Sequence, residues 1–151
     1  MEYKVRPMQI EDIENILEIE KVSYPTPWSA YAFRCEIFDN DIARYFVIEG
    51  EEDTAKIIGY GGMWIIVDEA HITNITVAPE HRGKKIGEII IGQLVMYAKS
   101  KGVLRMTLEV RVSNESAQRL YGKMGFVYAG IRPGYYVDNN EDAIIMWKEI
   151  Y

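Results

Sequence analysis

Residues 72–87 read ITNITVAPEHRGKKIG and form the most informative unit of the chain. The β-branched residues up to Val77 predict a strand, and Pro79 ends it because proline cannot continue the hydrogen bonding of a sheet. A polar loop with two glycines and three cations follows. A helix is expected over 86–100, where apolar residues recur at helical spacing. The first turn of a helix presents unpaired backbone N–H groups and the positive end of its dipole, so this unit can hold an anion.

The loop matches neither GxxxxGK[ST] nor GxGxxG, so it is neither a P-loop nor a dinucleotide-binding turn. Spacing alone leaves two interpretations open. The loop holds a phosphate group, or it is a capped helix start whose lysines are simply solvated.

Outward from this unit, the pattern predicts one mixed α/β domain over residues 1–151. A hairpin near the end of the chain favours a mixed sheet over a doubly wound parallel one. Helices are expected over 10–22, from the capping residue Ser29 to Phe38, over 86–100, and from Ser113 or Asn114 to 123. Strands are expected over 3–7, 43–48, 57–67, 71–77, 104–112, 126–136 and 143–148, with turns at 50–53 and 138–140.

Composition excludes several classes of protein. The chain has 151 residues, 48% of them hydrophobic and 26% charged, which is ordinary for a globular domain. Cys35 is the only cysteine, so neither an intramolecular disulfide nor a cysteine-rich metal site can form, and the two histidines make no HExxH pattern. We therefore expect no metal. No apolar run reaches the roughly 20 residues of a membrane span, and the N-terminal residues do not resemble a signal peptide. A cytoplasmic protein without a membrane partner is expected.

Charge is distributed unevenly along the chain. The net charge is −6, and residues 1–53 hold 5 basic and 13 acidic side chains, whereas residues 82–132 hold 10 basic and 3 acidic ones. An acidic chain binds nucleic acid poorly, so no direct nucleic-acid partner is expected. The basic block beside glycines is suited to a small polyanion.

Several motifs resemble one family. Residues 82–87 are similar to the (Gln/Arg)-x-x-Gly-x-(Gly/Ala) loop with which GCN5-related N-acetyltransferases (GNATs) hold the acetyl-CoA pyrophosphate. Residues 108–126, LEVRVSNESAQRLYGKMGF, resemble the RimI branch, whose members acetylate the N-terminal alanine of a small-subunit ribosomal protein. The PWS at 27–29, the two tyrosines at 135–136 and the EDAIIM at 141–146 resemble the same branch. The resemblance covers nearly the whole chain and is least distinctive over 40–70.

The resemblance implies the GNAT fold, with a central, mostly antiparallel twisted sheet and helices on both faces. We expect direct transfer from acetyl-CoA to an amine. Because Cys35 lies far from these motifs and before the cofactor segment, no acetyl-cysteine intermediate is expected. Lys85 departs from the pattern because it replaces a glycine, so its side chain either narrows the approach to the backbone or turns outward. The residues implied to bind the cofactor are Arg82, Gly83, Lys84, Lys85, Ile86, Gly87 and Asn114, together with the backbone of Ile75, Thr76 and Val77.

Two side chains are candidates for the chemistry. Glu109 lies on a predicted strand where its neighbours point to the opposite face, so its carboxylate can border a cleft; alternatively it pairs on the surface with Arg105 or Arg111. The resemblance assigns it as the general base. Tyr121 is either a core residue or, as the resemblance implies, the acid that protonates the thiolate. A phenol with a pKa near 10 suits that role.

The acceptor is harder to infer from the sequence. Trp28, Arg132, Tyr135 and Tyr136 are candidates for holding a peptide N-terminus, with aromatic packing at a sheet edge as the alternative. The small-subunit ribosomal protein is the expected substrate, and a monomer or weak dimer the expected state. A lysine side chain or a small-molecule amine is the alternative acceptor. A regulatory module that binds the cofactor without turnover is a third possibility, against which Glu109 and Tyr121 argue.

Overall fold

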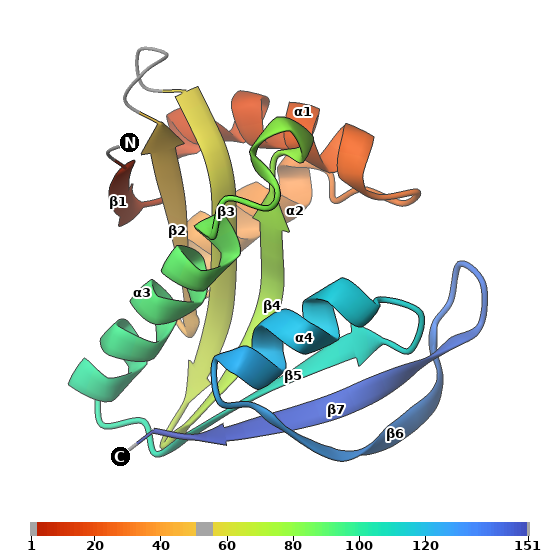
Figure 1. The fold of residues 1–151 in the computed structure, drawn as a ribbon. Helices are drawn as coiled ribbons and strands as arrows, with labels where there is room; N and C mark the ends of the chain where they lie inside the picture. Colours follow the sequence, from red (N-terminus) through yellow and green to blue (C-terminus); the bar gives the residue numbers. More distant parts are fainter. Residues whose placement is uncertain (1–2, 51–55, 151) are drawn as a thin grey trace.

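The computed structural model describes residues 3–50 and 56–150, which build one seven-stranded sheet between two layers of helices (Figure 1). The strands are β1 (Tyr3–Pro7), β2 (Ala43–Gly50), β3 (Lys56–Ile66), β4 (Glu69–Val77), β5 (Arg105–Arg111), β6 (Val127–Tyr136) and β7 (Glu141–Glu149). The helices are α1 (Ile13–Ser23), α2 (Ala30–Arg34), α3 (Ile86–Ser100) and α4 (Glu115–Lys123), with short helical turns at Ile10–Asp12, Cys35–Asp39 and Pro79–His81.

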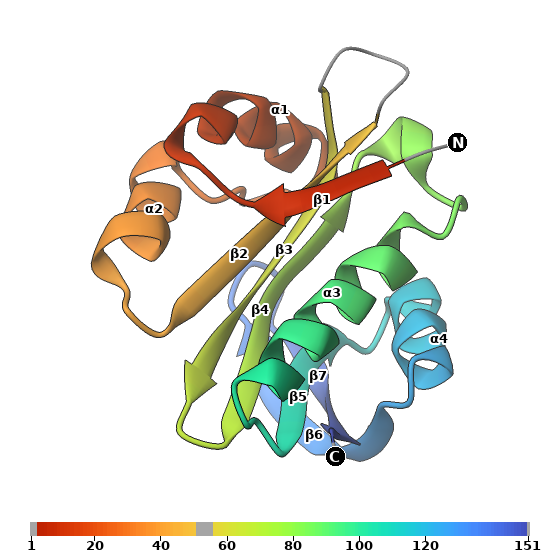
Figure 2. The ribbon, with the colours of Figure 1, turned by 90° about the vertical axis from the view of Figure 1, so that its left-hand side faces the viewer.

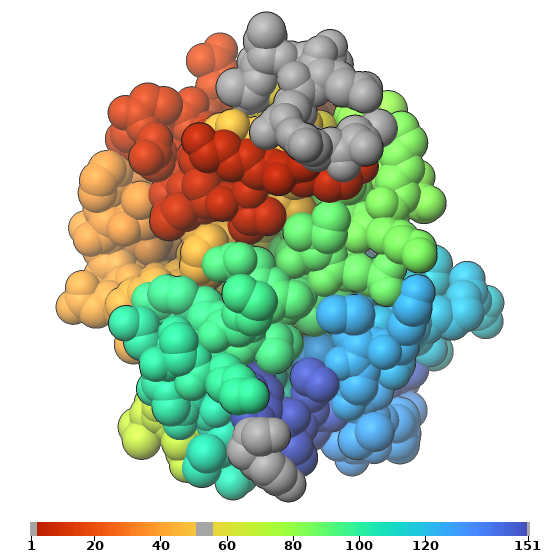
Figure 3. Space-filling view, turned by 60° about the vertical axis from the view of Figure 1, so that its left-hand side comes forward, coloured from red at the N-terminus to blue at the C-terminus, as the bar shows by residue number. Residues whose placement is uncertain are grey.

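The sheet has the order β1-β2-β3-β4-β5-β7-β6, and every neighbouring pair is antiparallel except β4 and β5. Helices α1 and α2 cover one face, while α3 and α4 lie side by side on the other (Figures 2 and 3). This arrangement confirms the expected mixed α/β fold with a mostly antiparallel sheet.

Each face of the sheet has its own hydrophobic core. Ile90 and Leu94 of α3 pack with Leu108 of β5 in one core, and Ile16 of α1 packs with Tyr60 of β3 in the other. Because successive side chains of a strand point to opposite faces, β2 and β3 contribute alternately to both cores. The helical stripes predicted from the sequence are therefore the surfaces that meet the sheet.

Strands β4 and β5 pair only over a short length. Their parallel register covers Glu69–His71 against Arg105–Thr107, and beyond His71 no described residue of β4 pairs with β5. On its other edge β4 carries a bulge, because Gly62 pairs with Asn74 and Met63 with Ile72, which leaves Thr73 as an extra residue. The sheet thus opens at the end of β4, directly before the loop that leads to α3.

Local signals in the sequence account for most element boundaries. Helix α3 has the predicted bounds. Ser29 caps α2 by accepting a hydrogen bond from the Ala32 N–H, and Asn114, rather than Ser113, caps α4 through the Ala117 N–H. The predicted first helix begins with a 3₁₀ turn over 10–12, and the second continues beyond Arg34 as a π-helical turn. The turn predicted at 50–53 lies, beyond Gly50, outside the described residues. No helix in the described ranges is long and apolar enough to cross a membrane.

Candidate active site

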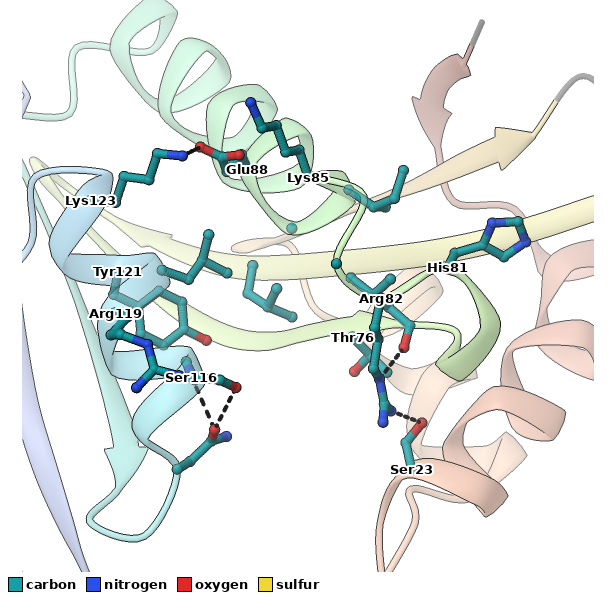
Figure 4. Close-up of a pocket in the computed structure, with 18 of the residues that line it drawn as sticks. Ser23, Thr76, His81, Arg82, Lys85, Glu88, Ser116, Arg119, Tyr121 and Lys123 are labelled. Carbon is teal, nitrogen blue, oxygen red and sulfur yellow. Dashed lines mark hydrogen bonds and ion pairs between the residues drawn. The ribbon is translucent and has the colours of Figure 1, made fainter. Parts of the chain in front are cut away.

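Two cavities meet where β4 leaves β5. The larger, of about 620 Å³, lies between the end of β4, the start of α3 and helix α4 (Figure 4). The smaller, of about 310 Å³, lies between β4, β5 and the segment that follows α1. Four residues line both cavities: Tyr24, Ile75, Asn114 and Tyr121. The two cavities therefore adjoin, and a molecule bound in one can reach a molecule bound in the other.

The larger cavity brings together nearly all residues predicted to bind the cofactor. Lys84 is the exception, since its exposed side chain does not line the cavity. In Figure 4, Arg82 lies on one side of the space and Tyr121 with Arg119 on the other. The lining residues that were predicted are Ile75, Thr76, Val77, Arg82, Gly83, Lys85, Ile86, Gly87 and Asn114.

Lys85 occupies the position at which the family pattern has glycine. The backbone conformation at this position explains the preference for glycine. The φ of 66° at Lys85 is left-handed, a conformation that favours glycine because it brings Cβ close to the following carbonyl oxygen. Gly83 is also left-handed, with φ of 77°. The Lys85 side chain points away from Thr76 and Tyr121 in Figure 4, so it adds charge without filling the space between them.

The loop fits a pyrophosphate group. The first N–H of α3 that donates to a backbone carbonyl is that of Ile89, which bonds to Lys85 O at 3.3 Å, so the preceding N–H groups are available to an anion. A Cβ built on Gly83 would have no neighbour within 4 Å, whereas one on Gly87 would lie 2.8 Å from Leu120 Cδ2. Glycine at 87 therefore permits the close packing of α3 on α4, and the left-handed residues shape the loop.

Arg82 holds this loop to the rest of the protein. Its Nε donates to the carbonyl oxygen of Val77 at 3.1 Å, and its Nη2 donates to Ser23 Oγ at 3.2 Å. The arginine therefore connects the end of β4 with the end of α1, beside the larger cavity.

Glu109 lines the smaller cavity, with a side chain that is only 9% exposed. Its Oε2 lies 2.5 Å from His71 Nε2, and its Oε1 lies 3.6 Å from Arg132 Nη1. The two arginines considered as surface partners of Glu109 form ion pairs with other carboxylates. Arg105 pairs with Glu69, while Arg111 pairs with Asp138 and Glu141. The interpretation of Glu109 as their surface partner is therefore wrong.

Tyr121 is buried at the junction of the two cavities. Its ring packs edge-on against Phe126, with centroids 6.0 Å apart, so it also belongs to the core. Burial raises the pKa of Tyr121, and the nearby Tyr24 and Tyr136 raise it further. The phenol is therefore held in its protonated form.

The four residues predicted to hold the acceptor divide into two groups. Trp28 and Tyr136 line the smaller cavity, whereas Tyr135 and Arg132 do not. The rings of Tyr135 and Tyr136 are perpendicular at 5.0 Å, and Arg132 lies over the ring of Tyr135 at 5.3 Å. The Arg111 guanidinium lies 4.0 Å above the ring of Tyr136. Burial raises the pKa of Tyr136 to about 12, although Arg111 opposes the shift.

The structure adds three residues that the sequence analysis did not single out. Glu20 lines the smaller cavity and is 1% exposed, and Tyr24 places its hydroxyl 2.6 Å from Thr76 Oγ1. Glu20 had a detectable signal, because it lies on the apolar stripe of α1, four residues after Ile16. The third residue is His71, which lies on the same face of the sheet as Glu109. The two residues are brought together only by the pairing of β4 with β5.

The two strands that separate, the helix start with available N–H groups, and a carboxylate and a buried phenol that line the same cavity fit the class of enzymes that transfer acyl groups from coenzyme A. The Acetyltransferase (GNAT) family model matches residues 13–126, and the chain belongs to this family. It is an acetyl-CoA-dependent N-acetyltransferase.

Individual relatives show which members of the family the chain is similar to. The chain is 47% identical to a candidate [ribosomal protein bS18]-alanine N-acetyltransferase of Bacillus subtilis, over 97% of this chain and 95% of that protein. It is 36% identical to the [ribosomal protein bS18]-alanine N-acetyltransferase of Haemophilus influenzae, over 91% of this chain and 94% of that protein. The crystal structure of the ribosomal-protein-S18-alanine N-acetyltransferase from Escherichia coli has a TM-score of 0.88 and 29% identity, covering 99% of this chain and 94% of that one. The resemblance to the RimI branch is confirmed.

Proposed function

We propose that this protein transfers the acetyl group of acetyl-CoA directly to the α-amine of the N-terminal alanine of ribosomal protein bS18, with Glu109 as general base and Tyr121 as general acid. The observation that carries the proposal is the junction of the two cavities. Tyr121 lines both of them, and Glu109 lies in the wall of the smaller one. The names of the relatives support bS18 as the acceptor.

The larger cavity is the site for acetyl-CoA in this proposal. Backbone N–H groups at the start of α3 bind the pyrophosphate, and Lys85 and Arg119 add positive charge around it. The edge of β4 that β5 leaves unpaired offers its backbone groups at Ile75–Val77 to the arm of the cofactor. A backbone N–H on this edge stabilises the oxyanion that develops on the thioester carbonyl.

Glu109 and Tyr121 handle the two protons of the reaction. Glu109 accepts the proton of the amine, directly or through one water, while the amine nitrogen forms its bond to the acetyl carbon. The carbon–sulfur bond breaks, and the Tyr121 hydroxyl gives its proton to the departing thiolate. Burial raises the pKa of Tyr121, so the phenol carries its proton when the thiolate forms.

An α-amine suits a single carboxylate base better than a lysine does. The α-amine titrates near 7.7–8.0 and lysine near 10.4, so deprotonating lysine at neutral pH costs roughly 3.4 kcal/mol more. The smaller cavity also holds a second carboxylate, Glu20, and the negative charge attracts an ammonium group. Trp28 and Tyr136 provide the apolar wall against which a small first residue packs.

The test uses purified protein, acetyl-CoA and a peptide that copies the N-terminus of bS18, with mass spectrometry to locate the acetyl group. A lysine-containing peptide with a blocked N-terminus is the control. Acetylation of the free α-amine alone is expected. Glu109→Gln should lower kcat by roughly 10²–10⁴-fold. Acetylation only of the lysine would overturn the acceptor, and full activity of Glu109→Gln would overturn the base.

A further inference from the structure

Tyr24 lies at the junction of the two cavities and has no role in the scheme above. It lines both cavities, as Tyr121 does, and the two phenols are close enough for the charge of one to act on the other. The Tyr24 hydroxyl lies 2.6 Å from Thr76 Oγ1 and 3.4 Å from the carbonyl oxygen of Ile75. It therefore stands beside the edge of β4 at which, in the proposed function, the acetyl group meets the amine.

The direction of the hydrogen bonds around Tyr24 is fixed by Asn74. Thr76 Oγ1 donates its only proton to Asn74 Oδ1 at 2.7 Å, and an amide oxygen can only accept. Tyr24 is therefore the donor in its bond to Thr76. The Ile75 carbonyl, the other group near the phenol, is also an acceptor. Because a phenol has one proton to donate, the Tyr24 oxygen has only lone pairs left to offer to the cavities.

Buried groups hold Thr76 and Asn74 in this arrangement. The Asn74 side chain is also a hydrogen-bond partner of the Glu20 carboxylate, so its amide N–H faces the carboxylate while its oxygen faces Thr76. The two oxygens of Glu20 further accept the Trp28 N–H and the Tyr60 hydroxyl. Thr76 is 4% exposed and Glu20 is 1% exposed. The donors thus run in one direction, from the junction of the cavities to a buried carboxylate.

We infer that Tyr24 binds and orients the acceptor amine: its hydroxyl oxygen accepts one N–H of the amine and so directs the nitrogen lone pair at the acetyl carbon. This inference rests on the proposed function, which places the amine in the smaller cavity. The hydrogen that Tyr24 accepts stays on the nitrogen and becomes the N–H of the product amide, while Glu109 takes the proton that leaves. Because the Tyr24 proton is bound to Thr76, the phenol does not donate to the thioester oxygen, which is left to a backbone N–H of β4.

The first test is Tyr24→Phe, which removes the hydroxyl and keeps the ring. The kcat/KM for the bS18 peptide should fall about tenfold, the loss typical of one hydrogen bond, while the dissociation constant of CoA stays the same. Tyr31→Phe is the matched control, because Tyr31 is 74% exposed and lines neither cavity, and its kcat/KM should equal that of wild type. An unchanged kcat/KM in Tyr24→Phe would overturn the inference. Weaker binding of CoA by the same factor would also overturn it, because the hydroxyl would then serve an N–H of the cofactor.

The second test examines the direction of the hydrogen bonds. Thr76→Val removes the oxygen that takes the Tyr24 proton and should lower kcat/KM for the peptide, whereas Thr76→Ser keeps that oxygen and should lose less. The double variant Tyr24→Phe/Thr76→Val should lose no more than Tyr24→Phe alone, because both changes remove one interaction. Losses that multiply would show that the two hydroxyls act independently and would overturn the inference. If wild type leaves the bS18 peptide unmodified, the proposed acceptor is wrong, and Tyr24→Phe is then measured with the amine that wild type does acetylate.

Discussion

The carboxylate of Glu20 accepts a hydrogen bond from the Tyr60 hydroxyl at 2.5 Å, although both side chains are almost completely enclosed. Its other oxygen accepts the backbone N–H of Trp28 at 3.1 Å. One side chain thus joins helix α1, strand β3 and the segment before α2 at the edge of the smaller cavity. Burial raises the pKa of Glu20, and its hydrogen bonds oppose that shift.

We predict that Glu20→Gln lowers stability by about 1–3 kcal/mol and raises the KM for the peptide. The amide of glutamine has one oxygen, whereas both carboxylate oxygens of Glu20 accept a hydrogen bond. The KM for acetyl-CoA should not change. Since the pKa of Glu20 is raised on folding, its contribution to stability is lost as pH rises through the folded value, and Glu20→Gln removes this dependence. Urea unfolding and steady-state kinetics measure both effects. Glu18→Gln, an exposed change on the same helix, should be neutral; equal effects of the two would refute the prediction.

Tyr121→Phe is expected to lower kcat by roughly 10²–10⁴-fold while acetyl-CoA affinity and thermal stability stay near wild type. The ring and its contact with Phe126 are kept, and only the hydroxyl is lost. Because burial raises the pKa of Tyr121, wild-type kcat should not fall on the alkaline side through ionisation of this group. Stopped-flow or thiol-release assays give kcat. Tyr136→Phe, which keeps its ring under Arg111, is the control and should lose only a few-fold.

Lys85→Gly should be about 1 kcal/mol more stable than Lys85→Ala. Both variants remove the same charge, but alanine retains a Cβ in the left-handed conformation while glycine relieves it. Thermal unfolding measures the difference in stability. Titration with CoA measures the loss of affinity that both variants share because each lacks the lysine charge. Equal stability of the two variants would show that the left-handed backbone carries no cost here.

Local features of the sequence predicted most of the fold. The stripe of α3, the Ser29 cap and the glycines and cations of residues 82–87 each depend on neighbours within a few residues. The opening between β4 and β5 could not be derived in this way, because the pairing of strands about 35 residues apart leaves no periodic signal.

The candidate site was predicted to a similar degree. The residues predicted for the cofactor loop line the larger cavity with the exception of Lys84. His71 was missed because a histidine on one strand acquires a meaning only when its neighbour on the next strand is known. Arg105 and Arg111 were equally plausible partners of Glu109 by spacing, and the carboxylates that they contact come from distant turns and strands.

Glu141→Gln should flatten the loss of stability between pH 4.5 and 2. Bonds from the Ser113 side chain and backbone N–H lower the pKa of Glu141 to about 2, with further help from Arg111 and Asn139. A carboxylate whose pKa falls on folding stabilises the protein above its ordinary value of 4.5, and that stabilisation is lost as pH falls towards 2. Urea unfolding at several pH values in this range measures the slope, with Glu149→Gln at the other end of β7 as control. Since Glu141 begins the strand that pairs with Tyr136, the variant should also raise the KM for the peptide. A slope identical to that of wild type would mean that these contacts do not hold the turn between β6 and β7.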